Sequence, residues 1–192
     1  MVKIAIFASG SGTNFENIVN CINNETITNA SVALLIVDKE NCFAIERSKN
    51  LNIPYCYVNP KAFINKAEYE KQILIKLKEF NIDLIVLAGY MRIVGNTLLD
   101  EYPNKILNIH PAYLPSFPGR HGILDTYEAK AEFGGVTVHY LDEGIDTGCI
   151  IKQEKVYIKP EWTLEEFEKH IHALEYDLYP RVINEVCNKF NL

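Results

Sequence analysis

The sequence has no run of apolar residues long enough to cross a membrane. Its first apolar segment, residues 4–8, is also too short for the hydrophobic core of a secretory signal. We therefore expect a cytoplasmic chain without a membrane partner. Internal repeats, low-complexity tracts and linkers are missing as well, which predicts a single domain.

Cysteine is scarce and scattered. The five cysteines, at positions 21, 42, 56, 149 and 187, contain no C-x-x-C pair. An odd, dispersed set argues against a disulfide framework and against a zinc site. The pattern suits a reducing compartment, and we expect no metal.

Cationic residues are also few, 19 against 25 acidic ones, and they form no cluster. Nucleic-acid binding needs grouped lysines and arginines to neutralise phosphates. We therefore expect small-molecule ligands and no nucleic-acid partner. With 192 residues of which 48% are hydrophobic, the chain can bury a full core in one domain.

Apolar runs and amphipathic segments alternate through the first half. The runs are residues 4–8, 32–37, 55–58 and 84–88, and the helical segments between them are residues 14–23, 41–51 and 66–80. The runs lack polar alternation, as in strands covered on both faces. This order predicts right-handed β-α-β units, and so an α/β, Rossmann-like fold with a mostly parallel central sheet and helices on both faces.

The second half has fewer crossovers. It contains a proline-rich loop after His110, a helical segment at 122–131, and strand-like segments at 135–141 and 149–158 around an acidic loop. The hydroxyl of Thr163 can cap the last helix while Glu166 completes a capping box. The buried face of this helix should contain Leu164, Phe167, Ile171, Leu174, Leu178, Val182 and Val186, with a bend at Pro180.

A glycine-rich loop, S-G-S-G-T-N at residues 9–14, follows the first strand and opens a helix. Backbone N–H groups and the helix dipole favour an anion there. Phe15 stands in place of the third glycine of a dinucleotide fingerprint, and a P-loop's Gly-Lys-Ser/Thr is missing. A single phosphate monoester suits the loop best. The alternatives are a dinucleotide, with Asp38 as the ribose-binding carboxylate, and a tight turn without a ligand.

A predicted strand at 105–109 ends at N-I-H-P, residues 108–111. Because strand side chains alternate, Asn108 and His110 should project to the same side. An amide can donate to a developing oxyanion and an imidazole can move a proton near neutral pH, so the pair suits acyl chemistry. Alternatively, both side chains only satisfy backbone groups of the loop.

Three carboxylates, Asp142, Glu143 and Asp146, lie together in the acidic loop. One carboxylate beside His110 would stabilise the imidazolium. Asp146 is our candidate, because the adjoining Thr147-Gly148 returns the chain to a strand and can fix its position. The alternatives are solvated side chains or calcium ligands, although the spacing does not match an EF-hand.

Residues 87–93 leave the fourth predicted strand at its carboxyl end, where open α/β sheets bind ligands. Their apolar side chains and backbone could hold a flat ring. Alternatively, Met91 and Ile93 belong to the core and Arg92 is a solvated or paired charge.

The remaining histidines are weaker candidates than His110. His121 can also face the cleft after the proline-rich loop. His139 lies on a predicted strand, where a satisfied core role is expected. His170 and His172 lie on the last helix, where we expect surface positions.

The motifs form an ordered set that resembles the formyltransferase family, and within it the folate-dependent enzymes of purine synthesis. They are S-G-S-G-T-N at 9–14, L-A-G-Y-M-R-I at 87–93, L-N-I-H-P-A-Y-L-P at 107–115, G-V-T-V-H at 135–139 and D-E-G-I-D-T-G at 142–148. The resemblance spans essentially the whole chain, and it implies a single formyltransferase domain over residues 1–192.

The resemblance implies transfer of the formyl group of 10-formyltetrahydrofolate, as cosubstrate, to the amine of glycinamide ribonucleotide, with Asn108, His110 and Asp146 as the catalytic residues. Residues 1–100 would be a phosphate-binding half and residues 101–192 a catalytic and folate-binding half. The implied binding residues are Ser11, Gly12, Thr13 and Asn14 for the substrate phosphate, Glu175 for the glycinamide substrate, and Met91, Arg92, Ile93, Val94, Leu141, Asp142, Glu143, Gly144 and Ile145 for the folate.

Two features depart from the family pattern. Residues 121–135 are less familiar, and Asp38 stands where asparagine is common. Family members that act on methionyl-tRNA or hydrolyse formyltetrahydrofolate carry a further domain, for which we expect no room here. Formyl transfer to an amino sugar nucleotide and a non-catalytic folate- or nucleotide-binding regulator remain alternatives. We expect a monomer or a homodimer.

Overall fold

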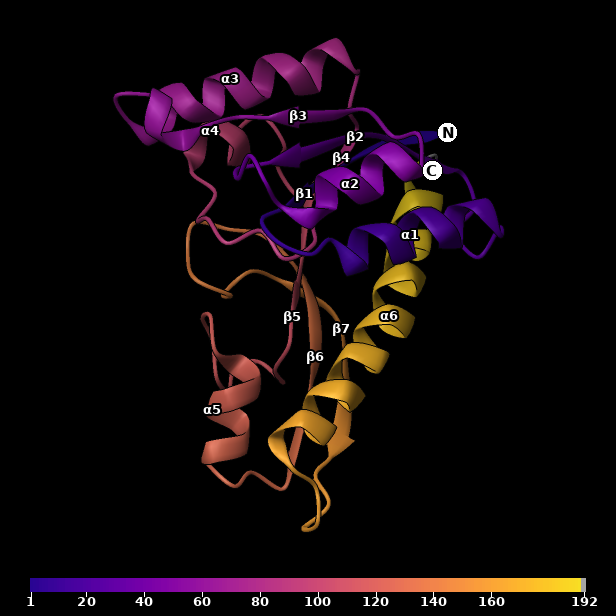
Figure 1. Ribbon diagram of the computed structural model, residues 1–192, viewed down its shortest axis with the longest axis vertical. Coiled ribbons are helices and arrows are strands. Elements are labelled where there is room, and N and C mark those ends of the chain that lie inside the picture. Colours follow the sequence, from indigo (N-terminus) through magenta and orange to yellow (C-terminus); the bar gives the residue numbers. More distant parts are fainter. Residues whose placement is uncertain (191–192) are drawn as a thin grey trace.

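Residues 1–190 are described by the computed structural model, and within them the chain forms one seven-stranded sheet (Figure 1). The last two residues of the predicted 101–192 half lie outside the described residues. The strand order is β3-β2-β1-β4-β5-β6-β7, and the strands are β1 (Val2–Ala8), β2 (Ala30–Val37), β3 (Tyr55–Tyr57), β4 (Leu84–Leu87), β5 (Ile106–His110), β6 (Phe133–Tyr140) and β7 (Ile150–Tyr157). The first five are parallel, while β6 and β7 pair antiparallel. The predicted mostly parallel α/β sheet is confirmed.

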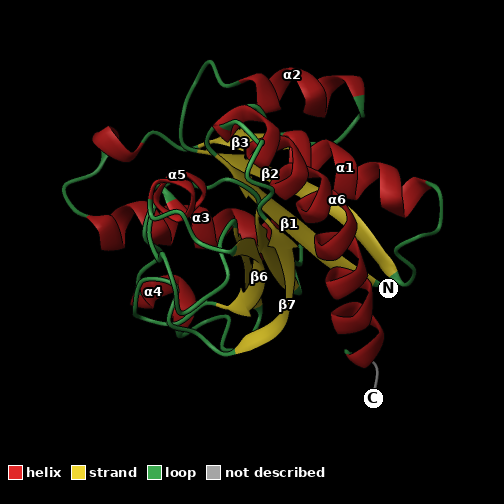
Figure 2. Cartoon of the chain, turned by 90° about the horizontal axis from the view of Figure 1, so that it is seen from below, coloured by secondary structure: helices red, strands yellow, loops and turns green. Residues whose placement is uncertain are grey.

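Helices cover both faces of this sheet (Figure 2). They are α1 (Thr13–Asn23), α2 (Phe43–Asn50), α3 (Lys66–Glu79), α4 (Asn96–Leu99), α5 (Gly122–Glu128) and α6 (Leu164–Lys189), with a short 3₁₀ turn η1 (Pro60–Ala62). One hydrophobic core contains side chains of α1, α2 and α6, and a second contains side chains of α3 and α4.

Strand β1 lies between these two cores. Ile4 and Ile6 belong to the core on the α1 and α6 side, whereas Ala5 and Phe7 belong to the core on the α3 side. Alternating side chains that are apolar on both faces are what a central parallel strand requires. This explains why the first half shows continuous apolar runs.

The last helix begins as predicted. The Thr163 hydroxyl accepts from the Glu166 N–H at 3.2 Å, and the Glu166 carboxylate accepts from the Thr163 N–H at 2.7 Å. The helix continues across Pro180 to Lys189. Of the seven predicted face residues, Leu164 and Leu174 are half-buried and the others are buried.

Tyr179 ties α6 to the sheet. Its hydroxyl lies 2.8 Å from the Leu87 carbonyl and 3.2 Å from the Leu107 carbonyl. These carbonyls belong to the neighbouring strands β4 and β5. The contact therefore fixes α6 against the strand ends that carry the candidate site.

Two boundaries in the second half differ from the prediction by two or three residues. Helix α5 ends at Glu128 rather than at 131, since the chain turns at Lys130 with a φ of 51°. Strand β6 begins at Phe133, two residues early, and passes through buried Gly134. A Cβ on Gly134 would lie 2.4 Å from the Phe167 ring, so glycine is needed here for α6 to approach the strand.

Candidate active site

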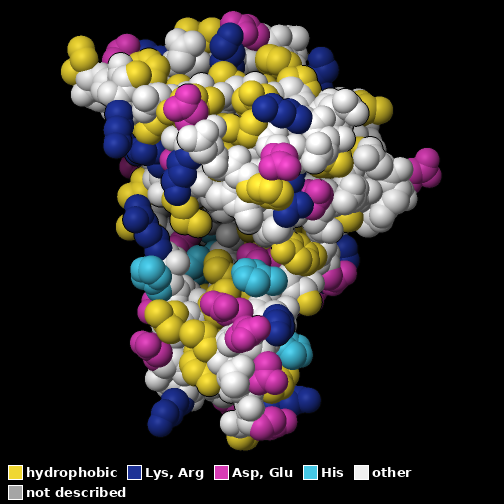
Figure 3. Space-filling model, in the orientation of Figure 1, with side chains coloured by type: hydrophobic (Ala, Val, Ile, Leu, Met, Phe, Trp, Pro, Cys, Tyr) yellow, Lys and Arg dark blue, Asp and Glu magenta, His cyan; other side chains and the backbone are white. Residues whose placement is uncertain are grey.

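A cavity of about 470 Å³ opens at the carboxyl ends of β1, β4 and β5. It is lined by residues 10–14, 87–94, 108–111, 119–120, 141, 142, 144–146, 172 and 175. Strand β1 pairs with β2 on one side and β4 on the other, so this is the point where the chain order of the sheet reverses. Open α/β sheets bind ligands at such points. The space-filling view shows histidine side chains around the indented middle of the molecule (Figure 3).

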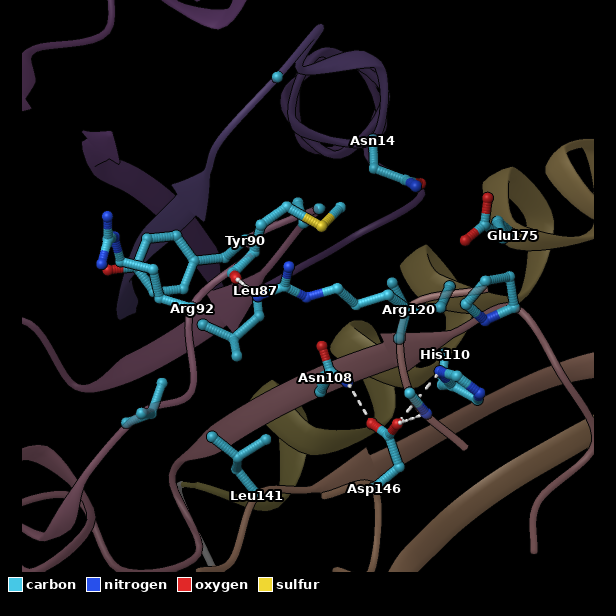
Figure 4. A pocket seen from close by; sticks show the side chains of 18 of the residues that line it. Asn14, Leu87, Tyr90, Arg92, Asn108, His110, Arg120, Leu141, Asp146 and Glu175 are labelled. Carbon is cyan, nitrogen blue, oxygen red and sulfur yellow. Dashed lines mark hydrogen bonds and ion pairs between the residues drawn. The ribbon is translucent and has the colours of Figure 1, made fainter. Parts of the chain in front are cut away.

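The structure brings Asn108, His110 and Asp146 together (Figure 4). Nδ1 of His110 lies 3.5 Å from Oδ2 of Asp146, and Nδ2 of Asn108 lies 3.4 Å from Oδ1 of Asp146. Asn108 and His110 share one side of β5, while Leu107 and Ile109 enter the core on the other side. The predicted alternation along this strand is confirmed.

Asp146 is held firmly. Its backbone has a left-handed φ of 54°, and its Oδ2 accepts from the Gly119 N–H at 2.8 Å. Burial alone would raise the pKa of this carboxyl, but its contact with the His139 ring, the hydrogen bond from the Gly119 N–H and the neighbouring His110 ring hold the pKa below its ordinary value. Asp146 is therefore a fixed carboxylate next to the His110 ring.

The His110 ring lies between two acceptors. Nε2 is 2.8 Å from the Phe117 carbonyl, and Nδ1 faces Asp146 on the opposite side of the ring. A protonated ring would donate to both acceptors at once. His110 is only 3% exposed, yet it lines the cavity.

His139 contacts the Asn108 amide from the neighbouring strand β6. It lies opposite Asn108 in the β5–β6 pair, with Nε2 3.2 Å from Asn108 Nδ2 and 3.5 Å from Asp146 Oδ1. Its Nδ1 is 2.8 Å from the Tyr140 carbonyl and must donate there, so a neutral ring accepts from Asn108 through Nε2. His139 is fully buried, as expected of a core histidine. Its contact with the site was not visible in the sequence, because the strand register was unknown.

The glycine-rich loop, here the phosphate loop (residues 9–14), forms one wall of the cavity. The four predicted phosphate ligands, Ser11, Gly12, Thr13 and Asn14, all line it. No side chain in the described residues caps α1, whose first N–H groups are therefore open to an anion. The loop is a suitable place for a phosphate.

A second wall is the ligand loop (residues 89–95). Met91 and Ile93 are 53% and 59% exposed, so they line the cavity instead of joining the core, and Val94 lines it while being buried. Arg92 lines the cavity as well, and its Nε donates to Asp38 at 2.8 Å. Asp38 is thereby paired within the protein, which leaves it poorly placed to bind a ribose.

The third wall comes from the acidic loop and its approach, through Leu141, Asp142, Gly144 and Ile145. Glu143, predicted as a folate contact, is not brought to the cavity; its carboxylate accepts from Asn96 in α4 at 3.3 Å. The reason is a tight turn, in which Oδ1 of Asp142 accepts from the Gly144 N–H at 3.0 Å. The intervening side chain is thereby directed outward.

Helix α6 supplies the last wall. Glu175 is 6% exposed and lines the cavity, and its Oε2 lies 2.7 Å from Nδ1 of His172. This hydrogen bond raises the pKa of His172 against the effect of burial, and the charges of Glu175 and Glu168 act in the same direction. The expected surface position of His172 is confirmed, since its side chain is 51% exposed, and the side chain lines the cavity as well. Its spacing of three residues from Glu175 places both side chains on one helix face.

Sequence reasoning also missed Arg120. This residue lines the cavity, and its Nη2 lies 3.4 Å from the Met91 carbonyl. His121, which was the candidate in this segment, is exposed at the start of α5 and does not line the cavity. The side chain that follows Gly119 therefore faces the cavity and the next one does not.

No helix within residues 1–190 combines the length and apolar character needed to cross a membrane. In the same part of the chain, no three histidine, cysteine, aspartate or glutamate side chains are grouped to hold a metal.

Comparison with known proteins identifies the family. Residues 2–183 match the family model described as formyl transferase. The chain is 46% identical, over 191 residues, to the phosphoribosylglycinamide formyltransferase of Bacillus subtilis, covering 100% of this chain and 97% of that protein. The crystal structure of glycinamide ribonucleotide transformylase 1 from Geobacillus kaustophilus matches with a TM-score of 0.95 at 46% identity, covering 97% of this chain and 99% of that one. That of the Bacillus halodurans phosphoribosylglycinamide formyltransferase matches with a TM-score of 0.93 at 48% identity, covering 96% and 94%. This chain therefore belongs to the formyl transferase family.

Proposed function

We propose that this chain transfers the formyl group of 10-formyltetrahydrofolate to the amine of glycinamide ribonucleotide, a step of purine biosynthesis. The main supporting observation is that Asn108, His110 and Asp146 converge in one cavity. This cavity lies between a loop suited to phosphate and two loops with exposed apolar side chains. The relatives of similar length, which carry this activity in their names, support the same reaction.

The acceptor has a phosphate at one end and a primary amine at the other. We place its phosphate against Ser11, Gly12, Thr13 and Asn14, at the start of α1, where unpaired N–H groups attract an anion. Glu175, across the cavity, then contacts the glycinamide ribonucleotide between its two ends. This placement directs the amine toward the catalytic residues.

The folate lies between the ligand loop and the acidic loop. Met91, Ile93 and Ile145 expose apolar side chains there, and the backbone of these loops offers hydrogen bonds to a flat ring. Arg92, Val94, Leu141, Asp142 and Gly144 complete the predicted folate-binding set that the cavity contains. Side-by-side binding supplies the orientation that makes a bimolecular transfer efficient.

In the reaction, the neutral amine attacks the formyl carbon and forms a new C–N bond. The carbonyl oxygen becomes an oxyanion, which receives hydrogen bonds from Asn108 and from protonated His110, while Asp146 supports the imidazolium. The adduct then collapses, the bond from carbon to the folate nitrogen breaks, and that nitrogen gains the proton lost by the amine. His110 or an ordered water carries this proton. No covalent enzyme intermediate forms.

The catalytic donors already have acceptors within the chain. Nδ2 of Asn108 faces His139 and Asp146, and Nε2 of His110 faces the Phe117 carbonyl. To stabilise the oxyanion, each must exchange one of these acceptors for the substrate oxygen. Catalytic hydrogen bonds commonly reach their final geometry only in the substrate complex.

A panel of amines tests the proposal, assayed by loss of 10-formyl folate absorbance. The panel contains glycinamide ribonucleotide, an amino sugar nucleotide and a simple primary amine. Of the three amines, we expect only glycinamide ribonucleotide to be formylated. Turnover only with the amino sugar nucleotide would assign another reaction of the family to this chain. Folate binding without any turnover would instead indicate a regulator.

The setting of this activity is also part of the proposal. We infer a cytoplasmic enzyme, monomeric or homodimeric, with small-molecule substrates, in which residues 1–100 bind the acceptor phosphate and residues 101–192 carry the catalytic residues and most of the folate site. All five cysteines are free thiols, which suits a reducing compartment. Size-exclusion chromatography with light scattering distinguishes the two oligomeric states.

A further inference from the structure

Helix α2 braces the phosphate loop from the side opposite the cavity. The Ala44 N–H donates to the Gly10 carbonyl at 3.2 Å, and Nε of Arg47 donates to the Ser11 carbonyl at 2.9 Å. Two successive carbonyls of the loop are therefore directed toward α2.

The orientation of these carbonyls fixes the orientation of the next N–H groups. In a trans peptide the C=O of one residue and the N–H of the next point in opposite directions. Holding the Gly10 carbonyl toward α2 therefore turns the Ser11 N–H away from α2. In the same way, Arg47 turns the Gly12 N–H away from α2. Both residues line the cavity, so these are donors that a phosphate can use.

Close packing makes the brace rigid. Gly12 has a φ of +74°, and a Cβ placed on it would lie 2.7 Å from the Ala44 Cβ. Ala44 and Ser48 are fully buried, and Ile45 is 9% exposed, so the helix that carries Arg47 is fixed in the core. The loop and α2 therefore cannot separate or rotate independently without losing this contact.

Arg47 connects the phosphate loop to the first turn of α1. Besides holding Ser11, its guanidinium pairs with the carboxylate of Glu16 in the first turn of α1, and it lies 4.9 Å from the centre of the Phe43 ring. Arg47 itself does not line the cavity. It therefore makes no direct contact with a phosphate bound in the cavity.

We propose that Arg47 is a positioning residue for the phosphate of the acceptor, acting through the peptide between Ser11 and Gly12. The guanidinium polarises the Ser11 carbonyl, which strengthens the Gly12 N–H as a donor to a phosphate dianion on the other side of the peptide. Hydrogen bonds in such a chain reinforce one another. This inference rests on the proposed acceptor, but it requires only that a phosphomonoester binds at the phosphate loop.

The test compares Arg47→Met with Lys49→Met. Lys49 lies on the same helix, with its ammonium over the Tyr55 ring at 5.7 Å, and its loss removes one positive charge without touching the loop. For Arg47→Met we expect KM for glycinamide ribonucleotide to rise about tenfold, which equals about 1.4 kcal/mol, while kcat and KM for the folate change less than twofold. Lys49→Met should keep the KM of the unmodified protein.

A phosphate-free acceptor separates positioning from general damage. With glycinamide riboside, which lacks the 5′-phosphate, Arg47→Met should behave like the unmodified protein. An equal loss with both acceptors, or an unchanged KM for glycinamide ribonucleotide, would overturn the role of Arg47. If Arg47→Met does not fold, Arg47→Lys decides, since an ammonium cannot hold Ser11 and Glu16 in the same fork geometry and should give an intermediate KM. An unchanged KM for glycinamide ribonucleotide in Arg47→Lys would likewise overturn the positioning role of Arg47.

A binding measurement separates this inference from the proposed reaction. Titration with inorganic phosphate should shift the amide NMR signals of Ser11 and Gly12, with about tenfold weaker affinity in Arg47→Met and unchanged affinity in Lys49→Met. This result together with no formyl transfer would reject the proposed function and keep the positioning role. Equal phosphate affinity in the unmodified protein and Arg47→Met would reject the positioning role even if formyl transfer is observed.

Discussion

His139 lies directly across the β5–β6 pair from Asn108, and Nε2 of its ring is 3.2 Å from the Asn108 amide nitrogen. Because Nδ1 of His139 donates to the Tyr140 carbonyl, Nε2 is left as the acceptor for the amide. The same amide nitrogen faces Asp146 at 3.4 Å. The orientation of the Asn108 side chain is therefore set by two neighbours, one on β6 and one on the acidic loop.

Replacing His139 should disturb both stability and catalysis. His139→Leu removes the acceptor and leaves buried polar groups unpaired, which should lower the free energy of unfolding by about 1–3 kcal/mol. Turnover should fall as well, because the Asn108 amide can then rotate. Urea unfolding and kcat measure the two effects, with His170→Leu on the exposed face of α6 as the control. Unchanged turnover in His139→Leu would show that Asn108 does not need this partner.

The lowered pKa of Asp146 gives a signed prediction for stability. The pKa of this carboxyl in the folded state lies below its ordinary value of 3.8, so ionised Asp146 stabilises the fold above that pH. The contribution is lost as pH falls through the lower, folded pKa. The stability advantage over Asp146→Asn should therefore be constant near neutral pH and shrink below pH 3.8. Urea unfolding across this range tests it, and an advantage that grows on acidification would contradict it.

The raised pKa of His172 predicts the opposite dependence. Its hydrogen bond with Glu175 raises the pKa above the ordinary value of 6.5, so the interaction stabilises the fold fully below pH 6.5 and is lost as pH rises through the folded pKa. The difference in unfolding free energy between the unmodified chain and His172→Gln should therefore be largest in mild acid and vanish in alkali. Exposed His170 serves again as the control, through His170→Gln. A difference that does not vary with pH would exclude the ion pair.

Tyr179 offers a test of the connection between α6 and the strand ends. Tyr179→Phe keeps the ring but removes the hydroxyl that lies close to the carbonyls of Leu87 and Leu107. We expect a loss of about 1 kcal/mol in the free energy of unfolding. Thermal and urea unfolding measure the change, and Tyr157→Phe on the exposed end of β7 is a matched control. A loss of equal size in both variants would argue against a specific contact of Tyr179.

Much of the fold could be predicted because its signals are local. Apolar runs without polar alternation marked the buried strands, and the pair Thr163 and Glu166 marked the start of α6. Strand alternation alone placed Asn108 and His110 on one side of β5. The choice of Asp146 as their partner combined the position of Thr147-Gly148 with the resemblance to the family.

The remaining features depend on contacts between distant segments. The register that places His139 opposite Asn108, and the contact between Glu143 and Asn96, are not encoded in any short pattern. The contact of the His110 ring with the Phe117 carbonyl likewise depends on how the proline-rich loop folds back on β5. Such features follow from tertiary packing, so sequence reasoning missed them.

The central claim is that Asn108 and His110 stabilise the oxyanion formed during formyl transfer. The most direct measurement is the single-turnover rate with bound 10-formyltetrahydrofolate and glycinamide ribonucleotide, compared between the unmodified chain, Asn108→Ala and His110→Ala. Losing one good oxyanion donor lowers turnover on the order of a hundredfold to a thousandfold, so each variant should show a loss of this size while circular dichroism confirms folding. Glu143→Ala, whose side chain does not reach the cavity, should keep the full rate. A folded Asn108→Ala or His110→Ala variant with an unchanged rate would contradict the claim.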